Sequence, residues 1–390
     1  MVPHWQPMVV ATRSIALLFA ASYIARVPVT AISLAVILVF RESGRGYDLA
    51  GLATGAYVVG LSVTAPLIGR LADRFGAPRV FLCGAPVCGI GLIGLVAGAD
   101  SLPVPALLGL AALAGGALPP LGALTRGLMT PLLSDAQRAR VFAIDATAQE
   151  LCFMGGPLVL AALIALGSAA QALVVIAGLL AAGAVLYWSV ARRLPRVPHV
   201  TGEERGPAPI RSSGLRALLA VSVLVGAMFG AIELSIAAAL EDAGSRDLAG
   251  MFLAIWAGGS LVGGLIAVRW PGSDPQRRQH VALVAAAATA FVLVPAAGAP
   301  LALAAVLFLQ GVTQAPLMAV GYALVPRLVD ARLSEAFAWL TSAVVGGIAV
   351  GTTLAGMASE HAGAGAGFLI GAVAPLVALG LALAFLRSPR

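Results

Sequence analysis

Long apolar runs, each broken by a short polar or Pro/Gly-rich segment, follow one another along the whole chain. Several of these runs exceed the roughly 20 residues that a helix needs to cross about 30 Å of hydrocarbon. Lipid offers the backbone no hydrogen-bonding partner, so a spanning segment must be a helix or part of a closed barrel. Because the runs lack the in/out alternation of a barrel strand, the pattern predicts an all-α membrane protein.

Dividing the chain at its polar breaks predicts twelve transmembrane helices in two groups of six. In the first half they cover residues 14–40, 48–69, 80–98, 103–126, 141–166 and 169–190. In the second half they cover residues 216–240, 248–268, 280–298, 300–325, 333–357 and 363–386. A polar, proline-containing segment separates the halves. We therefore expect an N-terminal six-helix bundle (1–190), a cytoplasmic linker (191–215) and a C-terminal six-helix bundle (216–390).

Two short patterns of the first half recur in the second half, in corresponding spans. Leu49, Ala50, Gly51, Gly60 and Arg70 recur as Leu248, Ala249, Gly250, Gly259 and Arg269. Pro131, Leu133, Asp135, Ala136, Phe142 and Ala143 recur as Pro326, Leu328, Asp330, Ala331, Phe337 and Ala338. Two recurrences at nearly the same spacing indicate a duplication, so we expect two pseudo-symmetric bundles. Such bundles around a midplane site are the physical basis of alternating access.

Charge fixes the orientation of these helices. The chain is 60% apolar and only 11% charged, whereas a soluble chain carries about 25% charged residues. Its +7 net charge comes from arginine alone, and all but four of the 24 arginines fall on one side of the expected membrane. The four exceptions are Arg26, Arg41, Arg45 and Arg246. This asymmetry predicts cytoplasmic termini in an inner (cytoplasmic) membrane, and it explains the basic balance without nucleic acid.

The loop after the second expected helix reads GRLADRFGAPR from Gly69 to Arg79. It resembles the signature that the major facilitator superfamily carries between its second and third helices, except that Ala77-Pro78 stands where the family often has more basic residues. The resemblance implies the major facilitator fold. It also implies a cytoplasmic gate latch, built from Gly69, Asp73, Arg74, Gly76 and Arg79, that stabilises the outward-facing state.

Physical reasons for these residue types support the latch. Gly69 permits close helix approach, Asp73 can accept hydrogen bonds from a neighbouring helix N-terminus, and the arginines can hold the cytoplasmic helix ends together. The alternative is a solvated turn that obeys the positive-inside rule, which explains the arginines but not the glycine spacing.

Four ionisable residues lie within the expected spans: Arg26, Asp145, Glu150 and Glu233. Each costs several kcal/mol in lipid unless it is paired or hydrated, so each is a functional candidate. Asp145 is placed to pair with Arg126 in a gate or structural bridge. Glu150 is either a proton carrier or the static partner of Arg26, and Glu233 is placed to exchange protons with the outside.

Further polar and aromatic residues are candidates for the substrate path, although each alone is more often a packing or interface residue. They are Tyr23, Tyr57, Trp256, Gln310, Gln314, Tyr322 and Trp339. In the fifth span, Gly155, Gly156 and Pro157 partly resemble the antiporter signature of proton-driven drug exporters. Leu158 to Ala162 replace the downstream glycine pair of that signature.

Together these features predict a monomeric, proton-coupled exporter of small amphipathic molecules. The alternative is a facilitator or a proton symporter that imports a small metabolite. No Walker loop, metal-spaced His/Cys set or nucleophile motif occurs in the sequence, so we expect no enzyme, no cofactor and no metal. The expected partners are the lipid bilayer, a small-molecule substrate and protons.

Overall fold

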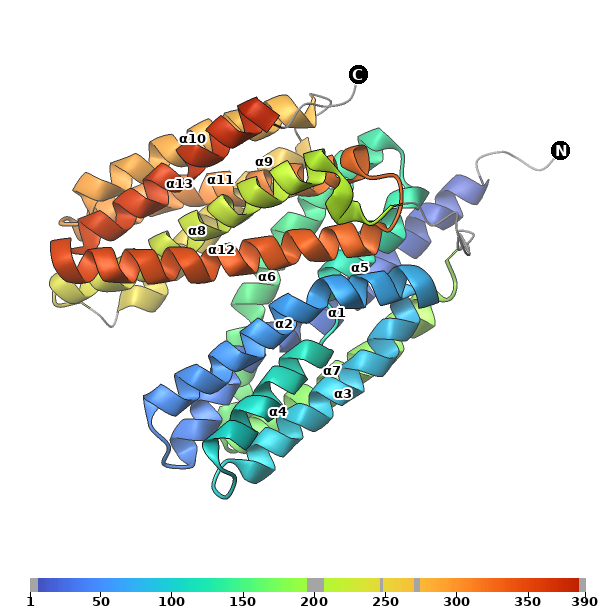
Figure 1. The fold of residues 1–390 in the computed structure, drawn as a ribbon, viewed down its shortest axis with the longest axis horizontal. Coiled ribbons are helices and arrows are strands. Elements are labelled where there is room, and N and C mark those ends of the chain that lie inside the picture. Colours follow the sequence, from blue (N-terminus) through green and yellow to red (C-terminus); the bar gives the residue numbers. More distant parts are fainter. Residues whose placement is uncertain (1–5, 195–206, 246–247, 270–273, 386–390) are drawn as a thin grey trace. The chain divides into compact units, whose positions relative to one another are not determined.

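The computed structural model describes residues 6–194, 207–245, 248–269 and 274–385, and over these residues it is all-helical (Figure 1). Twelve helical segments in this described part are long and apolar enough to cross a membrane. The helices of the first half are α1 (Gln6–Glu42), α2 (Tyr47–Phe75), α3 (Ala77–Gly98), α4 (Val104–Ala117), α5 (Leu121–Met129), α6 (Asp135–Ala165) and α7 (Ala169–Ala191). The short helix η1 (Thr130–Leu132) continues α5.

The helices of the second half are α8 (Ser213–Asp242), α9 (Ala249–Arg269), α10 (Pro275–Ala296), α11 (Pro300–Leu328), α12 (Leu333–Ala362) and α13 (Ala364–Phe385). A short helix, η3 (Pro209–Arg211), precedes α8. The predicted all-α fold with twelve apolar spans is therefore confirmed. Most of the predicted linker lies outside the described residues.

Several spans run further than the apolar pattern predicted. α2 continues to Phe75 and the fourth span continues to Leu132, six residues beyond the expected ends at 69 and 126. The reason is that arginines end an apolar run without ending a helix, because their backbones remain good helix formers. The fourth span is also broken at Pro119-Pro120, between α4 and α5, where the prolines cannot donate backbone hydrogen bonds.

The chain packs as two compact units. Unit 1 takes its described residues from Met1–Leu132, Cys152–Arg205 and Arg332–Ala338. Unit 2 takes them from Leu133–Leu151, Gly206–Ala331 and Trp339–Arg390. The first part of α6 thus packs in unit 2, and the first turns of α12 pack in unit 1. The predicted division into two bundles at residues 190 and 216 stays a prediction. A single boundary in the sequence does not describe segments such as these, which pack in the unit that the other half of the chain mainly forms.

The two units repeat one packing scheme. In unit 1, α1 packs on α7, α2 on α4, and α3 on both α4 and α7. In unit 2, α8 packs on α13, α9 on α11, and α10 on both α11 and α13. The repeated glycine of the sequence has the same role in each unit, because Gly60 meets the backbone of Ala112 in α4 and Gly259 meets that of Phe308 in α11. This shared scheme supports the duplication inferred from the sequence.

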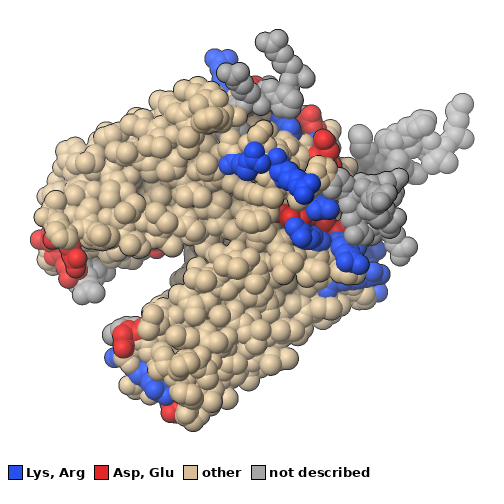
Figure 2. Space-filling model, in the orientation of Figure 1, with Lys and Arg blue, Asp and Glu red and all other residues tan. Residues whose placement is uncertain are grey.

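The charged side chains on the surface lie mainly at the helix ends. In the space-filling view, the Arg, Asp and Glu side chains gather at the ends of the helices, and the helix flanks on this face are almost free of charge (Figure 2). Large apolar side chains such as Leu67, Ile90 and Leu158 are exposed on these helices. An exposed apolar flank between charged ends is the surface expected of a membrane-spanning bundle.

Candidate functional site

Gly76 makes the turn at which α2 ends and α3 begins. Its φ of 94° lies in the region that favours glycine, and its N–H donates to the Ala72 carbonyl at 2.8 Å. This turn ends α2 just after Asp73 and Arg74. A side chain at this position would strain the turn, so the second glycine of the signature has a backbone role.

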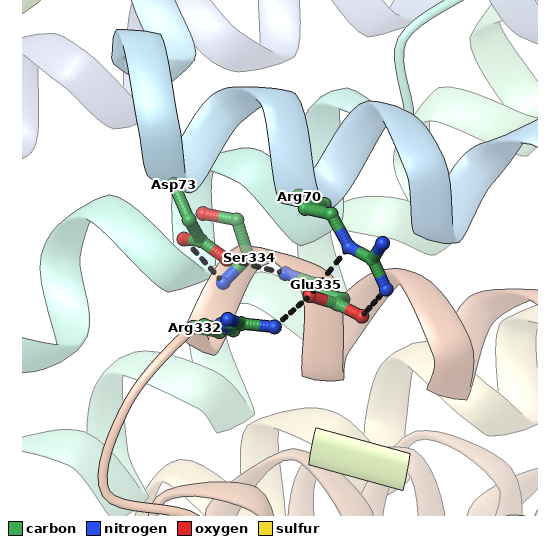
Figure 3. A network of polar contacts seen from close by, with 5 residues as sticks. All are labelled: Arg70, Asp73, Arg332, Ser334 and Glu335. Atoms are coloured by element: carbon green, nitrogen blue, oxygen red, sulfur yellow. Dashed lines mark hydrogen bonds and ion pairs between the residues drawn. The ribbon is translucent and has the colours of Figure 1, made fainter. Parts of the chain in front are cut away.

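Asp73 binds the first residues of α12. Its two carboxylate oxygens accept hydrogen bonds from the backbone N–H groups of Ser334 and Glu335, at 3.0 Å and 2.9 Å (Figure 3). The first N–H groups of a helix have no partner inside it, and the helix dipole there favours negative charge. The acceptor role expected of Asp73 is therefore present in the structure, and its partner is the N-terminus of α12.

Glu335 extends this contact into a network of charges. Its buried carboxylate, which is 1% exposed, lies 3.1 Å from Nη2 of Arg70 and 3.8 Å from Nη1 of Arg332 (Figure 3). Arg70 also donates from Nε at 3.4 Å. Since Glu335 is almost fully buried, two arginines offset the cost of taking its charge out of water. We call Arg70, Asp73, Arg332, Ser334 and Glu335 the α2–α12 network.

Two glycines let α12 come this close. A Cβ on Gly69 of α2 would lie 2.7 Å from Cα of Glu335 and 2.7 Å from the carbonyl oxygen of Ser334. A Cβ on Gly127 of α5 would lie 2.8 Å from both Cα and N of Ser334. These are backbone atoms, which cannot rotate away as a side chain can. The start of α12 therefore lies between α2 and α5, as the close approach expected at Gly69 requires.

The ionic contacts of the signature come from Arg70. Arg74 and Arg79 are exposed and form no ion pair within the described residues, and Arg74 lies 4.9 Å from the Phe75 ring centroid. The part of these two arginines in a latch stays a prediction. Ser334, Glu335 and Arg332 were not among the site residues predicted from the sequence. An acidic residue at the cytoplasmic start of the eleventh expected span is the signal that points to Glu335.

Arg26 and Arg126 are both buried in unit 1, at 4% and 3% exposure. The Arg26 guanidinium carbon lies 4.9 Å from the ring centroid of half-buried Tyr23, and that of Arg126 lies 5.9 Å from the ring of Phe337. Contacts of a guanidinium with an aromatic face lower the cost of burying its charge. Both arginines are therefore held in defined positions on α1 and α5.

The acidic candidates lie in unit 2. Asp145 is fully buried and Glu150 is 9% exposed, both in the first part of α6, whereas Glu233 in α8 is exposed. The pairs expected from the sequence, Arg26 with Glu150 and Arg126 with Asp145, join residues of different units and stay predictions.

Two further candidates of unit 2, Trp256 and Gln310, belong to a polar and aromatic cluster. Trp256 donates a hydrogen bond from its indole nitrogen to Oε1 of Gln310, and Nε2 of Gln310 lies 3.7 Å from the Met228 sulfur. Phe229 packs edge-on to Trp256 at 6.2 Å. The other candidates, in both units, are Tyr57, which is buried, and Gln314, Tyr322 and Trp339, which are half-buried.

In the fifth-span motif, Gly156 packs against α1. A Cβ on Gly156 would lie 3.0 Å from the Val27 carbonyl oxygen, and the Thr30 hydroxyl donates to the Cys152 carbonyl at 2.8 Å. Gly155 is half-buried, Pro157 is exposed, and both lie inside α6. The motif thus shapes the contact between α1 and the second part of α6. No group of His, Cys, Asp and Glu able to hold a metal ion occurs among the described residues.

Comparison with known proteins assigns the class. The sequence model of the Major Facilitator Superfamily matches residues 15–272 and 218–390. The chain belongs to this superfamily, and it is an integral multi-pass membrane protein of the transporter class. No sequence among curated proteins matches it significantly.

Solved structures share the fold. A bacterial homologue of the iron transporter ferroportin has a TM-score of 0.80 at 14% identity, covering 95% of this chain and 99% of that chain. The E. coli fucose:proton symporter has a TM-score of 0.73 at 15% identity, with coverage of 96% and 98%. The human organic anion transporter MFSD10 (TETRAN) has a TM-score of 0.72 at 18% identity, with coverage of 95% and 99%. At these identities the likeness establishes the fold.

Proposed function

We propose that the protein is a secondary active transporter that exports small amphipathic molecules in exchange for protons, by alternating access. The observation that carries the proposal is the presence of carboxyl groups within apolar spans, above all the buried Glu150 of α6 and the exposed Glu233 of α8. A carboxyl group within a membrane span is costly, so its presence there indicates a function or a pairing partner. A conformational change that alters the surroundings of the carboxyl group also alters the group's affinity for a proton.

The polar and aromatic candidates support a path for an amphipathic substrate. Trp256, Tyr322 and Trp339 offer apolar surface with a polar edge, and Gln310 and Gln314 offer hydrogen-bonding groups. Binding sites for small molecules combine mostly apolar walls with a few polar groups that fix orientation. The glycines and the proline of the fifth-span motif favour the exporting direction, by their resemblance to antiporters.

We also propose that the α2–α12 network is a latch on the cytoplasmic side, with both termini facing the cytoplasm. Gly69 and Gly127 allow the approach, Asp73 holds the helix N-terminus, and Arg70 and Arg332 neutralise Glu335. Opening the latch exposes the two backbone N–H groups to water. The protein acts as a monomer in the inner membrane, with no nucleic acid partner.

Vesicles containing the purified protein test the coupling. An imposed pH gradient is expected to drive accumulation of a substrate found by an unbiased screen, and Glu150→Gln and Glu233→Gln are expected to lose this drive. Glu360→Gln, an exposed carboxyl at the end of α12, is the matched control. Full pH-driven transport by both test variants would contradict proton coupling through these residues.

The importing alternative has one supporting observation, the likeness to a structure named as a fucose:proton symporter. Cells distinguish the two directions. When the proton gradient is collapsed, an exporter lets its substrate rise inside the cell, whereas a proton symporter lets it fall. A facilitator shows no dependence on the gradient.

A further inference from the structure

The first part of α6 and helix α9 make a close contact within unit 2. A Cβ on Gly264 of α9 would lie 2.8 Å from Cβ and 3.0 Å from Cγ2 of Thr147 in α6. Because Cβ of Thr147 is fixed to the backbone, a larger residue at position 264 would push the two helices apart. The Thr147 hydroxyl donates to the Ala143 carbonyl of its own helix at 2.7 Å, so its hydrogen bond is made inside α6.

The residues on the cytoplasmic side of this contact show how the two helices run. Ala143 and Ala146 of α6 share one buried apolar cluster with Ala267 of α9. From this cluster to the pair Thr147 and Gly264, the residue number rises along α6 and falls along α9. The two helices are therefore antiparallel here. We call the contact between residues 143–150 of α6 and 260–267 of α9 the α6–α9 contact.

One turn further along the α6–α9 contact, Glu150 faces Ser260. Glu150 is three residues after Thr147 and Ser260 is four residues before Gly264, and residues three or four apart share one helix face. The carboxyl group of Glu150 interacts with the hydroxyl group of Ser260. Ser260 is fully buried and Glu150 is nearly so. Polar groups that meet in such a low-dielectric place act strongly on each other.

We propose that Ser260 is a positioning residue for the proton on Glu150, and that its hydroxyl donates a hydrogen bond to the carboxylate once the proton has left. This inference rests on the proposed transport function, in which Glu150 carries a proton, and it names a residue that sets the proton affinity. A hydrogen bond to the charged form of an acid favours that form. With the bond in place, the carboxyl group releases its proton more readily than without it.

The ionisable groups of the two helices packed on this part of α6 are further away. On α9 the ionisable residue is Arg269, nine residues beyond Ser260 and so about 13 Å further along the axis. On α11, which contributes Ala315 and Ala319 to the alanine cluster, they are Tyr322 and Arg327. Both follow Ala319 toward the cytoplasmic end of α11. Ser260 is thus the polar side chain of α9 that acts on the carboxyl group.

Two other charged residues are rivals for an effect on Glu150. Asp145 is five residues earlier on α6, which turns the helix by about 140° beyond a full turn and places Asp145 on another face. Arg26, the partner expected as the alternative to proton transfer, belongs to unit 1, and this pair stays a prediction. A substitution of Ser260 changes neither residue, so its effect on Glu150 is separable from theirs.

α6 is weakest directly after Glu150. The helix passes from unit 2 to unit 1 after Leu151. Two glycines and Pro157 follow, and glycine has low helix propensity while proline has no N–H for the helix hydrogen-bond ladder. Bending α6 at this point displaces the Glu150 carboxyl group from Ser260. The proposal therefore links a movement of α6 to the release or uptake of the proton.

An infrared titration of the full chain in lipid vesicles tests the proposal without a substrate. The absorption of protonated carboxyl groups is followed against pH, and subtracting the spectrum of Glu150→Gln in the same background isolates the Glu150 band. In Ser260→Ala we expect the pH midpoint of this band to rise by about 1–2 units, as for the loss of a hydrogen bond to a charged group. An unchanged midpoint, or no titrating Glu150 band in the parent, overturns the proposal.

Two further serine variants separate hydrogen bonding from packing. Ser260→Cys fills nearly the same space with a weaker donor, so its midpoint is expected between those of the parent and Ser260→Ala. Ser222→Ala is the matched control, because Ser222 is a buried serine of unit 2 whose hydroxyl donates to the Leu218 carbonyl of its own helix at 2.7 Å. It is expected to titrate as the parent. A parent midpoint in Ser260→Cys, or a raised one in Ser222→Ala, overturns the positioning role.

A glycine pair tests the α6–α9 contact itself. Gly264→Ala places a methyl group against Thr147 and is expected to raise the midpoint toward that of Ser260→Ala. Gly258→Ala, also on α9, meets no atom within 4 Å and is the matched control. In the Ser260→Ala background, Gly264→Ala is expected to add little, because both changes remove the same hydrogen bond. Fully additive shifts overturn the proposal.

Failure of this inference and failure of the proposed transport function are distinguishable. If Glu150→Gln keeps full pH-driven transport, proton coupling through Glu150 fails, whatever the titration shows for Ser260. If Glu150→Gln loses that drive but Ser260→Ala titrates as the parent, the positioning role of Ser260 fails and the transport function stands.

Discussion

At the scale of single residues, the signature loop works through one carboxylate. Asp73 accepts the first free N–H groups of α12 with both of its oxygens, and it does so across more than 250 residues of sequence. Its residue type was enough to predict an acceptor for some helix N-terminus. Which helix it meets was beyond the sequence, because spacing within one loop contains no information on a contact made in three dimensions.

Asp73→Asn tests this contact. The amide has one acceptor oxygen and no negative charge, so one hydrogen bond and the interaction with the helix dipole are lost. We expect a stability loss of about 1–3 kcal/mol, as for hydrogen bonds to charged groups, and slower transport. The thermal unfolding midpoint and the transport rate check it. Asp100→Asn removes an exposed carboxylate from a loop and is expected to behave as the parent protein.

The ion pair of the same network is expected to contribute less. The Arg70 side chain is 56% exposed, so water and salt screen its attraction to Glu335. A double-mutant cycle with Arg70→Gln and Glu335→Gln should give a coupling energy of only ~0.2–1 kcal/mol, falling as salt rises. Glu335→Gln alone should cost more than Arg70→Gln, because Glu335 is buried and also faces Arg332. Equal effects from the two single variants would contradict this ranking.

At the scale of helices, the apolar runs of the sequence identified every span but not all of the helix ends. α2 and the fourth span run past the predicted ends, because hydropathy reports where lipid stops and not where the backbone hydrogen-bond ladder stops. The size of the side chains at the contact determines which helices can pack closely against each other. Gly69 and Gly127 admit α12, and Gly226 of α8 approaches the backbone of α12 near Ile348. In lipid, small residues promote helix association by letting backbones approach.

Two alanine substitutions on α2 separate packing from helix propensity. Gly69→Ala adds a methyl group against the backbone of α12, and overpacking of this kind costs about 1–3 kcal/mol. Gly55→Ala, on the same helix, meets no atom within 4 Å and gains helix propensity of up to ~1 kcal/mol. We expect the first variant to lower the unfolding midpoint and transport, and the second to leave transport unchanged. Similar behaviour of the two would argue against a close contact at Gly69.

At the scale of the whole molecule, the duplication could be detected in the sequence because the repeated residues make equivalent packing contacts in the two units. Gly60 and Gly259 each meet the next-but-one span of their own unit. The exchange of residues 133–151 and 332–338 between the units was not visible. Both segments continue straight into helices whose remaining parts pack elsewhere, so no break in hydropathy marks the change.

Orientation in the membrane is a prediction for the whole molecule. In a background with Cys83, Cys88 and Cys152 replaced by Ala, a cysteine at Asp100 should react with a membrane-impermeant maleimide in intact cells. A cysteine at Asp330 should react only after the membrane is opened. The arginine asymmetry requires this pattern, since basic loops stay inside. The reverse pattern would place the termini outside and would contradict a cytoplasmic latch.

The late position of residues 332–338 also bears on how the protein is made. Unit 1 is finished only when this segment, near the end of a 390-residue chain, leaves the ribosome. Until then the first six spans are in the membrane, but the Asp73 carboxylate and the surface at Gly69 lack their contacts with α12. A chain cut in its linker therefore yields a first half that cannot complete its own packing. We expect that half to be degraded alone and rescued when the second half is synthesised beside it.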